Sequence, residues 1–233
     1  MYSISVVLPA YNEEENISTM VTDVLSTIEA ITPDFEIVVV DDGSHDRTAE
    51  IVRALSARFP QVRLVQHPTN RGYGAAVYTG FTSAAKELVF FTDADNQFVL
   101  SEISRLLPGI GHADLVVGYR APRRDPWYRV LFGRGWSLLV TLLFGYTARD
   151  IDCAFKLFRR EILDHVVVNS RGATFSAEFL VRSKRHGYKI AEVPVTHRPR
   201  LAGQPTGARL HVILRAFREL VRFRVGLWQE RHV

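Results

Sequence analysis

Residues 35–44 read FEIVVVDDGS, an apolar run that ends in two carboxylates, a glycine and a serine. The same pattern recurs at residues 4–13, ISVVLPAYNE, and at residues 88–97, LVFFTDADNQ. Runs of β-branched and aromatic residues without polar alternation are typical of strands buried on both faces, as in parallel sheets. Helical spacing separates these runs, so we expect strands and helices to alternate along the first half of the chain.

Working outward, the pattern predicts strands at residues 4–8, 35–40, 62–66, 88–92 and 115–118, with helices at residues 14–30, 46–59 and 72–86. After residue 120 it predicts helices at residues 127–146, 175–186 and 210–228, and strands at residues 154–158 and 188–196. The expected fold class is therefore α/β, with a mainly parallel central sheet and helices on both faces.

The composition is that of an ordinary globular protein, with 233 residues, 47% of them hydrophobic and 23% charged. A single cysteine, Cys153, excludes an intrachain disulfide and favours an intracellular protein. The first residues lack the basic start of a signal peptide, and no run reaches the roughly 20 apolar residues that a spanning helix needs. We therefore expect a cytoplasmic protein, either soluble or bound at a membrane surface.

The net charge of +4 hides a division between the two halves. Residues 1–118 carry 7 Lys and Arg against 16 Asp and Glu, which gives −9, whereas residues 119–233 carry 22 against 9, which gives +13. Of the 29 basic residues, 25 are Arg, whose guanidinium suits phosphate and carboxylate. We expect the two halves to contact a charged ligand in different roles.

Polar residues follow the predicted strands directly. Asp93 and Asp95, with the amide of Gln97, suit a hard divalent cation such as Mg²⁺ or Mn²⁺, which normally keeps waters and bridges to substrate phosphates. Asp41 could accept hydrogen bonds from a nucleobase or ribose, and Tyr11 could stack on a nucleoside. Turns and helix starts favour the same residue types, so each cluster alone leaves a structural role open.

Together, residues 9–17 (PAYNEEENI), 38–48 (VVVDDGSHDRT), 70–76 (NRGYGAA) and 90–97 (FFTDADNQ) resemble family 2 glycosyltransferases of the GT-A fold. Residues 116–120, 149–161 and 187–207 resemble the dolichyl-phosphate mannosyltransferase and polyprenyl-phosphate glycosyltransferase group. The resemblance implies a catalytic domain over residues 1–207, with a nucleotide-sugar half (1–118) and an acceptor half (119–207). A basic amphipathic helix at residues 208–233 would follow.

The resemblance also implies the reaction, an inverting transfer of a sugar from a GDP-mannose or UDP-glucose type of donor to a polyprenyl or dolichyl phosphate. The DXD motif and its neighbour would hold the metal, namely Asp93, Asp95 and Gln97. The nucleotide-sugar would contact Pro9, Tyr11, Glu13, Val39, Asp41, Asp93 and Arg200. The expected catalytic residues are Asp95, Arg120 and Arg134, with Arg134 toward the acceptor phosphate, because an anionic nucleophile needs orientation more than a general base.

One segment departs from the polyprenyl-phosphate pattern. Residues 152–155 read DCAF where many members read TSGF, which leaves a hydroxyl acceptor as an alternative. The candidate bases for such an acceptor are Asp150, Asp152 and Glu178. A non-catalytic nucleotide-sugar binding module is a further alternative. His197, close to Arg200 in the sequence, is expected to be a packed loop residue, with contact to the donor phosphate as the alternative.

Two other classes are disfavoured. Nucleotidyltransferases commonly carry a Gly-rich loop and a Lys near the first strand, where this chain has residues 11–13, YNE. A nucleic-acid partner is not expected, because the acidic sheet edge would repel phosphate in the absence of a metal.

The C-terminal segment concentrates positive charge. Residues 197–233 hold 8 basic and 2 acidic side chains, and residues 210–228 have amphipathic helical spacing. A basic amphipathic helix binds the headgroup region of membranes. We expect peripheral contact with the cytoplasmic face of a membrane, with a membrane protein as the alternative partner.

Overall fold

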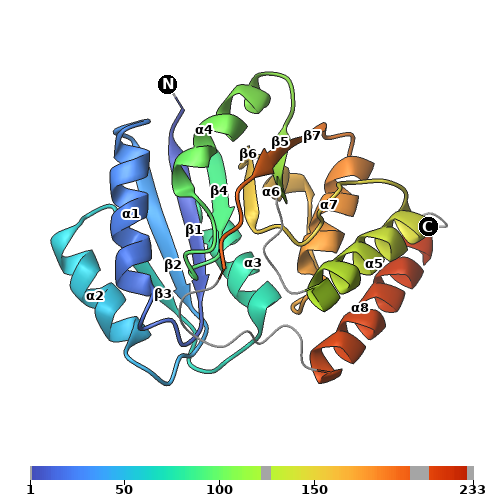
Figure 1. Cartoon of the computed structure of the whole chain (residues 1–233), viewed down its shortest axis with the longest axis horizontal. Coiled ribbons are helices and arrows are strands. Elements are labelled where there is room, and N and C mark those ends of the chain that lie inside the picture. The colour runs from blue at the N-terminus through green and yellow to red at the C-terminus, as the bar shows by residue number, and fades with distance from the viewer. Residues whose placement is uncertain (1, 122–126, 200–209, 230–233) are drawn as a thin grey trace.

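A computed structural model describes residues 2–121, 127–199 and 210–229. Its central seven-stranded sheet has the order β3-β2-β1-β4-β6-β5-β7 (Figure 1). The strands are β1 Ile4–Ala10, β2 Phe35–Asp41, β3 Val62–Gln66, β4 Leu88–Thr92, β5 Leu115–Arg120, β6 Phe155–Arg159 and β7 Ile190–Val195. Neighbouring strands are parallel except at β6, which runs antiparallel to both β4 and β5. The predicted α/β class with a mainly parallel sheet is confirmed.

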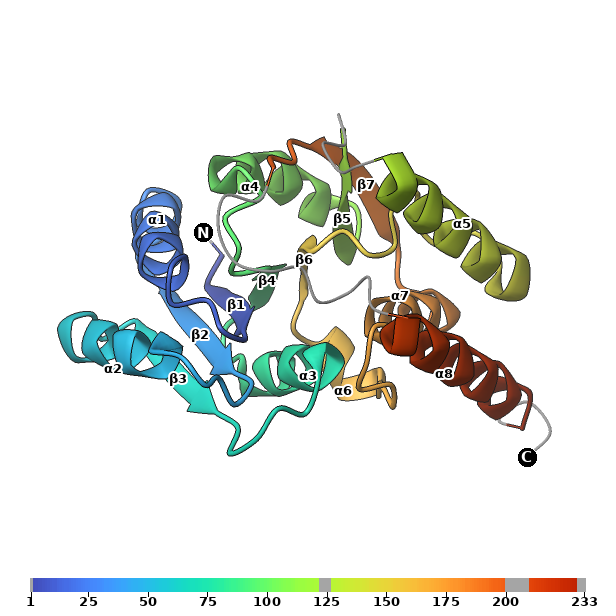
Figure 2. The same ribbon diagram turned by 60° about the horizontal axis from the view of Figure 1, so that its bottom comes forward.

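Helices cover both faces of the sheet (Figure 2). One face carries α1 Ile17–Glu29, α2 Thr48–Arg58 and the short α4 Ile103–Leu106, which is flanked by 3₁₀ turns at Leu100–Glu102 and Leu107–Gly111. The other face carries α3 Tyr73–Ser83, α6 Ile162–His165 and α7 Phe175–Arg185. Because both faces are covered, every residue of β1 and of β4 is buried, which explains their uninterrupted apolar sequences.

The last two long helices, α5 Trp127–Phe144 and α8 Leu210–Gln229, lie side by side at the end of the molecule near α7 (Figures 1 and 2). Phe144 stacks on Phe223 with ring centroids 4.8 Å apart, and Trp136 meets Phe217 edge-on at 6.0 Å. In the part of the chain that the structure describes, neither these nor any other helix combines the length and the apolarity that crossing a bilayer requires.

The central aromatic cluster joins the two halves of the chain. Phe81 of α3 contacts Phe158 of β6 at 4.9 Å and Phe179 of α7 at 5.3 Å between ring centroids. Burying rings of this size stabilises the fold by about 1.5–3 kcal/mol each. The second half of the chain is therefore packed into the same core as the first.

Candidate functional site

The loops that follow β1, β2 and β4 are joined at one edge of the sheet. The Asn12 backbone N–H donates to Ser44 Oγ at 2.9 Å, and the His45 N–H donates to Asn12 Oδ1 at 2.9 Å. Asn96 Nδ2 donates to the Asn16 carbonyl at 3.2 Å. Asn12 and Asn96 have φ near +55° and +58°, a conformation that Asn tolerates better than most residues. The three polar clusters of the sequence therefore meet at the carboxyl ends of the strands.

The acidic pair Asp93 and Asp95 comes directly after β4. Enclosure by protein and the charge of Asp95 raise the pKa of Asp93 to about 7, against the opposing effects of a Tyr73 hydrogen bond and of Lys156 and Arg120. The Tyr73 hydroxyl donates to Asp93 Oδ1 at 3.0 Å, and the Gln97 N–H donates to Asp95 Oδ1 at 3.2 Å. Two neighbouring carboxylates whose negative charges repel each other favour the binding of a positive charge.

Two cationic side chains, Arg120 and Lys156, lie close enough to Asp93 to oppose the rise in its pKa. Arg120, at the end of β5, donates through Nε and Nη2 to the two carboxylate oxygens of Asp150, both at 2.7 Å. This ion pair is mostly buried, with side chains 12% and 10% exposed. Lys156 of β6 is 1% exposed, and its ammonium donates to the Cys153 carbonyl. Burial lowers the pKa of Lys156.

The residues present fit a divalent cation that shares its coordination with a substrate. Over residues 2–121, 127–199 and 210–229, no group of three or more His, Cys, Asp and Glu side chains is arranged to hold a metal. Two aspartates beside a substrate cleft are typical of Mg²⁺ and Mn²⁺ sites that are completed by phosphates and water. Gln97, the third expected ligand, donates its amide Nε2 to the Arg198 carbonyl at 2.9 Å, which orients the amide oxygen.

The residues expected around the nucleoside differ in exposure. Pro9, Val39 and Asp41 are buried, and Asp41 accepts hydrogen bonds from the Ser44 N–H at 3.2 Å and from Gln66 Nε2 at 3.0 Å. Tyr11 is half-buried. Glu13 is also half-buried, and it accepts a 2.6 Å hydrogen bond from Asn16 Nδ2. Tyr11 and Glu13 are thus the members of this group with solvent-facing surface.

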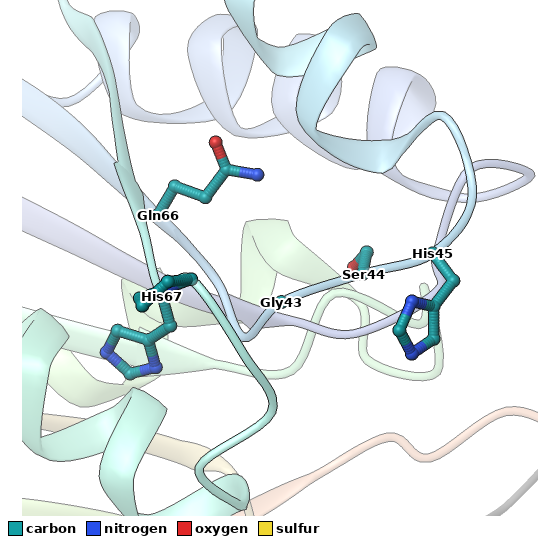
Figure 3. Close-up of a pocket in the computed structure, with 6 residues that line it drawn as sticks. Gly43, Ser44, His45, Gln66 and His67 are labelled. Atoms are coloured by element: carbon teal, nitrogen blue, oxygen red, sulfur yellow. The ribbon is translucent and has the colours of Figure 1, made fainter.

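An open hollow of about 450 Å³ lies beside Asp41, between the loops after β2 and β3. It is lined by Gly43, Ser44, His45, Gln66, His67 and Pro68. Figure 3 shows Gln66 and His67 pointing to opposite sides of the chain at the end of β3. His67 Nδ1 lies 2.6 Å from Asp42 Oδ1 and its Nε2 lies 3.0 Å from Thr79 Oγ1, so this face of the hollow is fixed by buried hydrogen bonds.

Two further site residues were predicted from the sequence, Arg134 and Arg200. Arg134 is exposed on α5, and Arg200 lies outside the described residues. His197 is 4% exposed and packs edge-on against Phe98 at 5.3 Å between ring centroids, which agrees with the packed loop residue that the sequence favoured.

The three carboxylates considered as bases for a hydroxyl acceptor differ sharply. Glu178 is 1% exposed and accepts from the backbone of Asn169 and Ser170, from the Ser170 hydroxyl and from Arg182. Asp150 is engaged by Arg120. Asp152 is exposed. Glu178 is therefore a structural carboxylate that ties the start of α7 to the preceding loop.

Sequence reasoning missed Tyr73 and Lys156. A Lys inside the otherwise apolar run Phe155–Phe158 was the available signal for a buried charge. Tyr73 stands between two glycines in residues 72–74, and nothing in that pattern indicates which strand end its hydroxyl reaches.

A mainly parallel sheet with the acidic pair after β4, and with helices on both faces, defines the GT-A class of nucleotide-sugar transferase folds. The chain belongs to a family described as Glycosyl transferase family 2, which matches residues 5–167. The resemblance drawn from the strand-end motifs is therefore confirmed.

Curated relatives include several transferases that act on lipid phosphates. A dolichyl-phosphate beta-glucosyltransferase of Trichomonas vaginalis is 36% identical over 209 residues, covering 81% of this chain and 62% of its own. A polyprenol monophosphomannose synthase of Mycolicibacterium smegmatis is 31% identical over 211 residues, covering 85% and 78%. The chain spans 62–64% of the length of several of these relatives.

Among solved structures, the fold is similar to glucosyl-3-phosphoglycerate synthase of Mycobacterium tuberculosis. The structure of that protein with Mn²⁺, UDP and glucosyl-3-phosphoglycerate aligns with a TM-score of 0.72 at 21% identity, over 95% of this chain and 80% of the other. At this identity the likeness establishes the fold.

Proposed function

We propose that this chain transfers a sugar, with inversion, from a nucleoside diphosphate sugar to a polyprenyl or dolichyl phosphate. The observation that carries the proposal is the pair Asp93 and Asp95 directly after β4, with the charge of the mostly buried Arg120 acting on Asp93. The names of the lipid-phosphate transferases among its relatives support the class of acceptor.

The proposed reaction is a single displacement. An oxygen of the acceptor phosphate forms a bond to the anomeric carbon while the bond from that carbon to the donor diphosphate breaks. The nucleoside diphosphate leaves with the electron pair of that bond, and attack from the opposite face inverts the anomeric centre. The acceptor is already an anion at neutral pH, so the protein has to orient it and to stabilise the leaving charge.

The residues divide between these tasks. Asp93, Asp95 and Gln97 would hold Mg²⁺ or Mn²⁺, which supplies positive charge to the leaving diphosphate. Asp150 holds the Arg120 guanidinium in one orientation, so Arg120 can meet phosphate without first being ordered. Tyr11 and Glu13 would contact the nucleoside, with Pro9, Val39 and Asp41 forming the floor behind them. Arg134 and Arg200 remain proposed contacts of the acceptor phosphate and the diphosphate.

The helices α5 and α8 supply the proposed contact with a membrane. Large apolar side chains are exposed on both helices, namely Leu131, Phe132, Leu138 and Leu142 on α5 and Phe217, Val221, Val225 and Trp228 on α8. On α8 the spacing places them along one stripe, next to the exposed Arg218 and Arg222. A lipid surface with anionic headgroups matches both features. We propose that the chain docks there, on the cytoplasmic face, so that the acceptor phosphate reaches the sheet edge.

The decisive experiment is a transfer assay with radiolabelled UDP-glucose and GDP-mannose. The acceptors are undecaprenyl phosphate in vesicles, dolichyl phosphate in vesicles and a soluble hydroxyl sugar, each with Mn²⁺ or Mg²⁺. We expect labelled lipid with one of the two donors and none with the hydroxyl sugar. Labelled soluble sugar without labelled lipid would instead identify a hydroxyl acceptor, and donor binding without turnover would identify a binding module.

A thermal-shift comparison of the nucleoside diphosphates separates donor choice from catalysis. The matching nucleotide binds the folded chain and not the unfolded one, so it stabilises the fold more the further its concentration exceeds its dissociation constant. We expect either UDP or GDP, with Mn²⁺, to raise the melting temperature more than the other. If neither UDP nor GDP raises the melting temperature, the proposed donor site is contradicted.

A further inference from the structure

Tyr73 is the first residue of α3, and its side chain reaches from one strand-end loop to another. Its hydroxyl donates to Asp93 Oδ1 at 3.0 Å, and its ring lies 6.5 Å from that of Phe91 on the strand that leads to Asp93. A phenol has one proton to donate and a fixed ring plane. The hydrogen bond therefore restricts rotation of the Asp93 carboxylate.

The start of α3 is held rigidly from the sheet side. The Asp42 carboxylate accepts the backbone N–H of Arg71 at 2.9 Å and that of Gly72 at 2.8 Å. Gly72 has a φ of +98°, which side chains disfavour. Asp42 is itself 2% exposed and hydrogen-bonded to His67. The residue before Tyr73 is thus fixed by a buried carboxylate.

A loop from the second half of the chain holds the same helix start from the other side. The Arg171 carbonyl accepts the Ala75 N–H at 3.1 Å. A Cβ atom at Gly74 would lie 2.5 Å from the Gly172 carbonyl oxygen, so the two backbones touch. Tyr73 lies between these two fixed points, and its position has little freedom to adjust to Asp93.

We infer that Tyr73 is a positioning residue for the divalent cation: its hydroxyl presets the Asp93 carboxylate in the orientation that a cation shared with Asp95 requires. The inference rests on the proposed metal-dependent transfer. It assigns a role to a residue that does not bind the cation itself, and the role belongs to the hydroxyl rather than to the ring.

The test is Tyr73→Phe, which removes only the hydroxyl. The contact of the Tyr73 ring with Phe91, 6.5 Å between ring centroids, does not involve the hydroxyl, so the ring of the variant can stay in place. Mn²⁺ is titrated into the variant and the wild type, with and without UDP or GDP, and bound Mn²⁺ is followed by electron paramagnetic resonance. Losing a hydrogen bond to a charged group is expected to raise the half-saturating Mn²⁺ concentration about five- to tenfold. The melting temperature without Mn²⁺ should change by less than about 2 °C.

Two further variants isolate the hydroxyl. Tyr78 lies on the same helix, with its ring centroid 3.9 Å from the Arg171 guanidinium carbon. The control variant Tyr78→Phe should bind Mn²⁺ like the wild type. Tyr73→Leu removes ring and hydroxyl together and should weaken Mn²⁺ binding no more than Tyr73→Phe does. Loss of Mn²⁺ binding with Tyr73→Leu but not with Tyr73→Phe would assign the role to the ring and overturn the inference.

The Mn²⁺ titration distinguishes a wrong role for Tyr73 from a wrong proposed function. If the wild type binds Mn²⁺ and Tyr73→Phe binds it equally well, the positioning role is wrong and the metal site stands. If the wild type shows no bound Mn²⁺ with either nucleotide, the proposed metal dependence itself fails, and the positioning role with it.

Discussion

The strand-end loops of the first half and the helices α5 and α8 of the second half differ in how they present polar and apolar groups. At the strand ends, carboxylates are engaged one by one: Asp42 accepts from Arg71, Gly72 and His67, and Asp93 accepts from Tyr73. On α8, arginines and large apolar side chains are exposed to solvent together. We propose that the first region is preorganised for a ligand of fixed shape and that the second docks on a surface without fixed shape.

This difference follows from the chemistry proposed for each half. A nucleoside diphosphate is small and highly charged, so binding it requires placed donors and a cation. A lipid surface is fluid, so it is met by an apolar stripe with flanking cations whose exact positions matter less. The opposite net charges of residues 1–118 and 119–233 express the same division.

The largest effect is expected at the proposed metal site, where a substitution should abolish sugar transfer without changing membrane binding. Asp95→Ala should lower sugar transfer about 10³-fold, because the charge on the leaving diphosphate loses its counter-charge. Binding to anionic vesicles should stay unchanged, since α8 is untouched. The measurements are turnover in the lipid-phosphate assay and vesicle co-sedimentation. The control is Asp23→Ala, on the exposed side of α1. Full transfer activity in Asp95→Ala would show that Asp95 does not hold a required metal.

The next effect is expected at the mostly buried pair of Arg120 and Asp150, both in the second half of the chain. Asp150→Asn should lower turnover about 10- to 100-fold, because the guanidinium loses its orienting partner next to the reacting groups. The affinity for the nucleoside diphosphate should change less than about twofold, since the strand-end loops are unchanged. The matched control is Asp164→Asn, which breaks the exposed Arg160–Asp164 pair and should leave turnover as it is. Equal losses in both variants would contradict the proposed role of Arg120.

The sequence predicted the first half more completely than the second. Apolar runs such as Phe35–Val40 identify buried parallel strands, and polar residues directly after them identify the ligand edge, because strand direction alone brings these ends together. The strand at residues 154–158 was also predicted, but its antiparallel placement between β4 and β5 depends on the path of the chain between them. Local periodicity carries no information on that path.

The site shows the same limit at the level of single residues. Asp93 and Asp95 follow a strand and are visible in the sequence. The partners that set their environment, Tyr73 from α3 and Lys156 from β6, come from elements 20 and 63 residues away from Asp93. The mostly buried pairing of Arg120 with Asp150 was not expected either, because an Arg near a phosphate site and an Arg in an ion pair look alike in a sequence.

A smaller effect is expected on the membrane side. The double variant Val221→Ser, Val225→Ser removes two exposed apolar side chains from the α8 stripe and should weaken binding to anionic vesicles about tenfold. Binding of Mn²⁺ and nucleotide should be unaffected. Val167→Ser, which changes an exposed valine outside α5 and α8, is the control. If the double variant binds vesicles as tightly as the wild type, the docking surface does not include this stripe of α8.

The smallest expected effect is on the free energy of unfolding, through the ionisation of Glu36 in the acidic first half of the chain. Burial opposes ionisation of Glu36, but hydrogen bonds from Ser5 and the Ala85 N–H, together with Arg63, lower its pKa below the ordinary value. A lowered pKa stabilises the fold above the pKa of the unfolded chain, and this stabilisation is lost as the pH falls through the folded-state pKa. Glu36→Gln should therefore reduce the free energy of unfolding by about 1 kcal/mol at pH 7. The loss should shrink below about pH 4.

Urea unfolding at pH 7 and below about pH 4 measures this loss in the free energy of unfolding, with Asp23→Asn as the exposed control. A loss of the same size at both pH values would mean that the ionisation of Glu36 does not contribute to the stability of the fold.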